Sequence, residues 1–87
     1  MKVVLLSHAE KQLRKLPKID QIAVSHKIRT LQKPEFSGEE KLSGFSHIYR
    51  VRVGNYRVVY KKTKETLSIV IIRHRRDVYK IVKELLG

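Results

Sequence analysis

Residues 48–62 have the sequence IYRVRVGNYRVVYKK, and this stretch decides the fold. Apolar and basic side chains alternate on both sides of Gly54-Asn55, as they do in strands with one buried face. Gly-Asn between two such runs favours a two-residue hairpin turn. The stretch therefore predicts two antiparallel strands, over 48–53 and 56–62, joined by a tight turn.

A two-residue turn also determines which side chains share a face, because Arg52 then pairs with Arg57 and Val51 with Val58. One face is apolar and is expected to pack on helices: Tyr49, Val51, Val53, Tyr56, Val58 and Tyr60. The other face, which we call the arginine face, carries Arg50, Arg52, Arg57 and Lys61.

Like charges directly opposite each other on a sheet are unfavourable by up to about 1 kcal/mol. Stability alone therefore does not explain the pair of Arg52 and Arg57, although an ordinary solvated sheet face is the plain alternative. The planar guanidinium matches phosphate geometry and can stack on bases. The arginine face is thus a candidate surface for nucleic acid.

The preceding residues predict a strand and two helices. Lys2–Leu6 is a short apolar strand, and the Ser7…Glu10 pattern is typical of a capping box at a helix start. A second helix is expected over about 19–32, with its apolar stripe at Val24, Ile28 and Leu31. Two further apolar residues lie off this stripe and predict a contact on a second side of the helix: Ile19 and Ile22.

After the hairpin, Leu67–Ile72 is almost wholly apolar, which predicts a strand covered on both faces. Asp77 then caps a short helix whose apolar stripe is Val78, Ile81, Val82 and Leu85. The order is β-α-α-β-β-β-α. We expect a single α+β domain over residues 1–87, with an antiparallel sheet packed against a helical hairpin and a short C-terminal helix.

The sequence Arg73-His74-Arg75-Arg76 lies where the last strand passes into the last helix. If Lys64-Glu65 is also a two-residue turn, Arg57 pairs with Ile72 and His74 lies on the arginine face. A shift of one residue would place Arg73 there instead. Tyr79 lies one position off the helix stripe, so it either faces the cleft beside the arginines or packs in the core.

Charge and composition narrow the function. The 87 residues carry a formal net charge of +12, with +3 in residues 1–40 and +9 in residues 41–87. This uneven field implies a polyanionic partner, either nucleic acid or an acidic protein. There are no cysteines and no long apolar run, and the apolar start is too short for a signal peptide. We expect a soluble cytoplasmic protein with no membrane partner.

The other histidines do not have metal-ligand spacing: His8, His26 and His47. We therefore expect no metal and no cofactor.

Three segments resemble the RelE/ParE toxin superfamily: Lys41–Gly44, Tyr49–Tyr60 and Ile72–Tyr79. The resemblance implies a toxin of a type II toxin-antitoxin system. RelE-like members are ribosome-dependent endoribonucleases that cut mRNA in the ribosomal A site, and a small antitoxin silences them by wrapping around them. We expect that antitoxin to be acidic where it touches this chain. The partners implied are therefore mRNA, the ribosome and the antitoxin.

The superfamily's functional residues correspond to positions of this chain. Its basic pair on one strand corresponds to Arg50 and Arg52, and its arginine on the next strand to Arg57. Its arginine after the last strand corresponds to Arg75, with Arg73 as the alternative, and its terminal tyrosine to Tyr79. The strand pair is often lysine in the superfamily, and the later segment often has glycine where this chain has Arg73.

Metal-independent cleavage of RNA uses the 2′-hydroxyl as nucleophile and needs a base, an acid and positive charge on the phosphate. Arg50, Arg52 and Arg57 fit charge stabilisation. His74 is the natural acid or base candidate, because histidine exchanges protons nearest to neutral pH. Tyr79 could stack on a base or orient the hydroxyl. Further RNA contacts are expected from Lys61, Arg73 and Arg76.

Two other functions stay open. A ParE-like toxin would share the fold and inhibit DNA gyrase without nuclease activity. A non-catalytic RNA-binding module would use the same charges and perform no chemistry. Cleavage of mRNA on translating ribosomes distinguishes RelE-like action from both.

Overall fold

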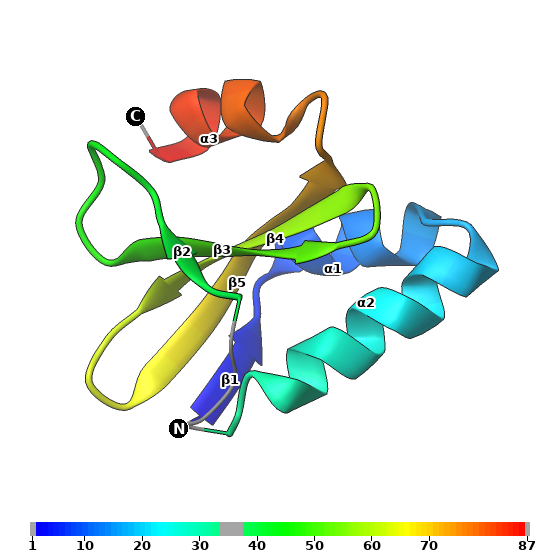
Figure 1. Ribbon diagram of the computed structural model, residues 1–87, viewed down its shortest axis with the longest axis horizontal. Helices are drawn as coiled ribbons and strands as arrows, with labels where there is room; N and C mark the ends of the chain where they lie inside the picture. The colour runs from blue at the N-terminus through cyan, green and yellow to red at the C-terminus, as the bar shows by residue number, and fades with distance from the viewer. Residues whose placement is uncertain (1, 34–37, 87) are drawn as a thin grey trace.

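The computed structural model describes residues 2–33 and 38–86. Within them, three helices accompany a sheet with the strand order β1-β5-β4-β3-β2 (Figure 1). The elements in chain order are β1 (Lys2–Leu5), α1 (Ser7–Lys15), α2 (Lys18–Thr30), β2 (Glu40–Lys41), β3 (Ile48–Val53), β4 (Tyr56–Lys62), β5 (Thr66–His74) and α3 (Val78–Leu86). The α+β class and the element order that the sequence predicts are confirmed, with β2 as an additional short strand.

The β3–β4 hairpin has the predicted register. Arg52 pairs with Arg57, and Val51 pairs with Val58. Gly54 has a φ of 58°, the left-handed conformation that a tight hairpin turn requires. The hairpin therefore separates an apolar face from the arginine face, as the alternation of side chains predicts.

The sheet is mixed, so the expectation of a purely antiparallel sheet is wrong for one strand. β1 pairs with β5 in parallel, with Val3 beside Leu67, whereas the other neighbouring strands are antiparallel. No tight turn joins β1 to a neighbouring strand, and only a hairpin connection would force antiparallel pairing. The helices α1 and α2 follow β1 instead.

Helices cover both faces of the sheet (Figure 1). α1 and α2 lie on one face, over a core that includes Val24, Leu31 and Tyr60. α3 lies on the other face, where Val78 and Val82 pack with Val59 and other residues of a second core. The predicted burial of β5 on both faces is confirmed, since it contributes to both cores.

Two local expectations about the helices are wrong. No side-chain hydrogen bond caps α1, and the carboxylate of Glu10 instead accepts from Arg14 one turn along the helix, a favoured spacing for an ion pair. Ile19 and Ile22 are 79% and 58% exposed, so within the described residues they make no second packing contact.

The β4–β5 register differs from the conditional expectation by one residue. Arg57 pairs with Arg73 rather than with Ile72, and Tyr56 pairs with His74. A register irregularity between Val59 and Tyr60 accounts for the difference, because one extra residue in a strand reverses the faces of all residues beyond it. Arg73, and not His74, therefore lies on the arginine face.

No helix in the described part of the chain is long and apolar enough to cross a membrane.

Candidate functional site

Three arginines form a row across the three central strands of the sheet, near the Gly54-Asn55 turn. Arg52 on β3 pairs with Arg57 on β4, and Arg57 pairs with Arg73 on β5. The row lies on the face that carries α3, because Ile71, two residues before Arg73, packs in the core beneath that helix. The fold thus places three like charges side by side at one end of the sheet.

Arg57 is the central residue of this row. Its Nη1 donates to the carbonyl oxygens of Tyr56 at 2.9 Å and Gly54 at 3.2 Å. The pKa of Arg57 is lowered, chiefly by partial burial and then by the positive charges of its arginine neighbours, while Tyr79 acts in the opposite direction. The groups whose charge influences this pKa are Arg50, Arg52, Arg75 and Tyr79. We call these five residues the arginine cluster.

Arg50 differs from the other members because it is buried, with 8% of its surface exposed. Its Nη2 donates to Oε2 of Glu40 at 2.6 Å, across the β2–β3 pair. A buried guanidinium needs such a partner. Sequence reasoning missed Glu40, because the two residues of β2 are too few to show any periodicity.

The segment between β5 and α3 brings the last two members to the cluster. The backbone N–H of Arg75 donates to the carbonyl of Asn55 at 2.8 Å, which holds the segment against the hairpin turn. α3 is then anchored by Val78 and Val82, both buried, whereas Tyr79 is 47% exposed. The sequence alternative in which Tyr79 faces the cleft is the one observed.

His74 is not part of the cluster. Its ring lies edge-on to Tyr56 with 5.6 Å between ring centroids, on the face that packs against α1 and α2. Its Nδ1 accepts from the backbone N–H of Arg76 at 3.2 Å. His74 also lines a pocket with Gln12 and Lys15 of α1. The placement of His74 beside the arginines was wrong, and its position here is that of a packing residue.

The remaining predicted RNA contacts lie apart from the centre. Lys61 is exposed and pairs with Ile48, four positions along β4 from Arg57, a separation of about 13 Å along the strand. Arg76 is exposed in the turn before α3. These two residues extend the basic surface without entering the cluster.

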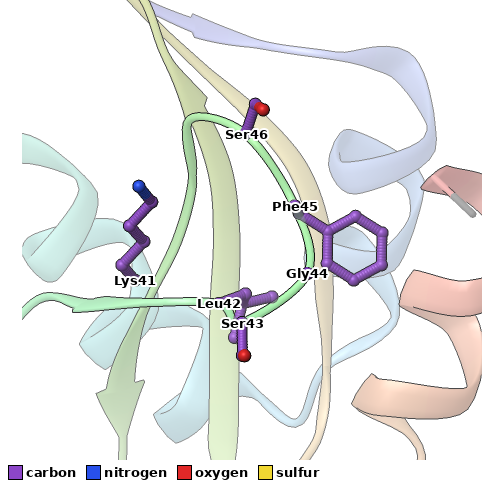
Figure 2. Close-up of a pocket in the computed structure, with 6 residues that line it drawn as sticks. All are labelled: Lys41, Leu42, Ser43, Gly44, Phe45 and Ser46. Carbon is purple, nitrogen blue, oxygen red and sulfur yellow. The ribbon is translucent and has the colours of Figure 1, made fainter.

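The chain between β2 and β3 forms a loop beside α3. Residues 41–46 surround a hollow of about 440 Å³ (Figure 2). The loop is closed by a hydrogen bond from the N–H of Leu42 to the carbonyl of Ile48 at 2.9 Å. No local sequence pattern marks this segment as part of a site.

Within residues 2–33 and 38–86, no three histidine or acidic side chains gather in a way that could hold a metal ion.

The model of the ParE toxin family of type II toxin-antitoxin systems, parDE, matches residues 3–79. The chain belongs to the RelE/ParE toxin superfamily. The match covers β1 to the start of α3 and includes every member of the arginine cluster.

One RelE relative and two solved RelE structures show how similar this chain is to individual members of the superfamily. Toxin RelE3 of Methanocaldococcus jannaschii is 35% identical over 40 residues, which are 46% of this chain and 46% of that relative, so the match spans less than half of either protein. The solved RelE–RelB complex of Pyrococcus horikoshii OT3 aligns at a TM-score of 0.71 and 26% identity, covering 85% of this chain and 93% of that chain. Isolated E. coli RelE aligns at 0.69 and 25%, covering 98% of both.

Proposed function

We propose that this toxin is an endoribonuclease that cuts mRNA in the ribosomal A site and so inhibits translation. One observation carries the proposal: Arg52, Arg57 and Arg73 lie side by side on neighbouring strands. Positive charge from Arg50, Arg52 and Arg75 also lowers the pKa of Arg57. RNA cleavage passes through a crowded, doubly charged transition state at phosphorus. This transition state needs such a concentration of positive charge. The similarity to solved RelE toxins supports the same function.

In the proposed reaction the 2′-oxygen attacks the adjacent phosphorus and the bond from phosphorus to the 5′-oxygen breaks. The products are a 2′,3′-cyclic phosphate and a free 5′-hydroxyl. Arg57, Arg52 and Arg75 stabilise the negative charge that builds on the phosphate oxygens. Arg50 contributes to the same field, although its guanidinium already binds Glu40.

The proton transfers require other residues, because arginine side chains stay protonated near neutral pH. His74 lies on the opposite face of the sheet and is therefore not positioned for this role. Among the described residues, two groups able to exchange protons are the phenol of Tyr79, within the cluster, and the carboxyl of Glu40, which accepts from Arg50. Both are candidates for the acid and base.

Cleavage by purified protein on translating ribosomes, followed by mapping of new 5′ ends, tests this function. We expect cuts within codons for the wild type and a loss of about 10²–10³-fold for Arg57→Ala. Arg29→Ala is the matched control, since it removes the same charge from an exposed position of α2. An Arg57→Ala variant that cuts within a few-fold of wild type would exclude the cluster as the active site.

Inhibition of DNA gyrase is the second candidate function, and two observations favour it. The matching family is that of the ParE toxins, and a ParE-like toxin would inhibit gyrase. In addition, His74 is absent from the arginine face, where it was expected. A supercoiling assay with purified gyrase separates the two functions. Inhibited supercoiling without mRNA cuts would assign the protein to the gyrase class. If the protein has neither effect, the function that remains is RNA binding without catalysis.

We also propose that a small antitoxin, acidic at the contact, binds this chain in the cytoplasm. The P. horikoshii relative was solved as a RelE–RelB complex. The chain offers two surfaces for such a partner: the positive half, with a net charge of +9, and the exposed apolar residues Ile19 and Ile22 on α2. A helical antitoxin could cover the second surface and neutralise the first.

A further inference from the structure

A groove of about 250 Å³ lies between the β2–β3 loop and α3. It is lined by Leu42, Ser43, Phe45, Tyr79, Val82 and Lys83. Leu42 and Val82 belong to the second core, and Phe45 packs against that core while keeping part of its surface exposed. Figure 2 shows the Phe45 ring extending from the loop toward α3. The groove thus has an aromatic wall, an aliphatic floor and two polar residues.

The groove adjoins the arginine cluster because they share Tyr79. This side chain lines the groove and is also within electrostatic reach of Arg57. A ligand that binds Arg57 through a phosphate and continues past Tyr79 places its next chemical group in this groove. In RNA that group is a ribose with its base.

We propose that this groove is a nucleobase subsite in which Phe45 is the stacking surface for one unpaired base of the substrate. The inference rests on the proposed function, because it deepens the site of RNA cleavage. The volume is below the roughly 300 Å³ at which pockets for drug-sized ligands begin, so the groove suits a single ring system. Ser43 and Lys83 can contact the polar edge of a base whose faces lie on apolar walls.

The loop that carries Phe45 has a backbone conformation that costs energy. His47 has a φ of 62° although it is not glycine, whereas Gly44, with a φ of 84°, adopts that conformation without steric cost. The carbonyl of His47 accepts from the N–H of Lys62 at 2.8 Å, which ties the strained residue to β4. Backbone strain of this kind is concentrated at functional sites. Packing of α3 alone would not require a strained loop to present Phe45.

Binding of short 2′-O-methyl RNA, which lacks the attacking hydroxyl, tests the subsite. The fluorescent base 2-aminopurine is placed at each position in turn, since stacking quenches its emission. We expect one position to be quenched by the wild type. Phe45→Leu should abolish that quenching and weaken binding about tenfold, because base–aromatic stacking contributes about 1–3 kcal/mol.

Phe45→Tyr is the matched control, because it keeps the aromatic face and should keep the quenching. Phe45→Leu should leave the salt dependence of binding unchanged, whereas Arg57→Ala should reduce the slope by about one unit by removing one phosphate contact. Thermal unfolding and circular dichroism of each variant report whether it folds.

The proposal is overturned if folded Phe45→Leu quenches as the wild type does, or if Phe45→Tyr loses the signal as completely as Phe45→Leu. It is also overturned if sedimentation shows that the wild type self-associates through Phe45 while 2-aminopurine stays bright, since the groove would then bind a second copy. A Phe45-dependent signal in a protein that fails to cut mRNA would instead refute the proposed function and keep the subsite. If none of the Phe45 variants folds, Ser43→Leu, which narrows the groove from an exposed position of the loop, should abolish the quenching, and unchanged quenching in that variant refutes the subsite.

Discussion

The guanidinium of Arg50 donates to the carboxylate of Glu40 at 2.6 Å, and the two side chains are 10% and 57% exposed. The arginine is therefore almost fully removed from water, while its acidic partner remains accessible. Burial without a partner would leave an uncompensated charge. Glu40 thus has a structural role next to the proposed active site, in addition to its candidacy in proton transfer.

Replacing Glu40 with glutamine should destabilise the protein by about 1–2 kcal/mol, a value discounted from that of fully buried pairs because Glu40 is exposed. Urea unfolding measures the loss. Glu65→Gln is the control, since Glu65 is exposed in the β4–β5 turn. Equal stabilities of the two variants would show that Arg50 does not depend on this carboxylate.

Replacing Arg57 with glutamine should stabilise the fold while it abolishes cleavage. The change removes the repulsion of Arg57 by Arg52, Arg50 and Arg75. The pair with Arg52, directly opposite on the sheet, is alone unfavourable by about 0.2–1 kcal/mol. Wild-type stability should also rise with salt more steeply than that of Arg57→Gln, because salt screens the repulsion. A variant less stable than wild type at low salt would contradict this account of the arginine row.

His74→Gln should leave mRNA cleavage within a few-fold of wild type, because the ring packs on Tyr56 away from the arginines. A general acid or base would contribute about 10²–10⁴-fold. Tyr79→Phe, assayed in parallel, removes a hydroxyl within electrostatic reach of Arg57 and should lower the rate by at least about tenfold. A large loss in His74→Gln together with a normal rate in Tyr79→Phe would reverse the assignment.

Tyr60 should make stability fall in strongly alkaline solution. Burial, then the hydrogen bond of its hydroxyl to Glu39 at 2.6 Å, raises the pKa of Tyr60 far above its usual value. The folded chain therefore keeps a proton that the unfolded chain releases near pH 10. The contribution is complete below about pH 10 and is lost as the pH rises further.

Tyr60→Phe removes both the hydroxyl and this pH dependence. Urea unfolding at about pH 9 and pH 11 should show a steeper loss of stability in the wild type than in the variant. Because other groups also titrate in this range, the difference between the two slopes is the test. Parallel slopes would mean that Tyr60 ionises in the folded protein as readily as in the unfolded chain.

Local pattern was enough to predict most of the chain's elements and part of its site. The alternation around Gly54-Asn55 determined the β3–β4 register, because a two-residue turn leaves one pairing of the strands. With that register came the opposition of Arg52 and Arg57. The apolar stripes likewise predicted the second and the last helix. These features depend on residues close together in sequence.

Tertiary structure decided the features that depend on residues far apart. A single irregularity between Val59 and Tyr60 placed Arg73 on the arginine face and turned His74 toward the helices. The two-residue strand β2 brought Glu40 to Arg50, and the loop after it brought Phe45 to α3. No local pattern encodes these outcomes, because side-chain faces alternate with every residue and one shift in register reverses them all.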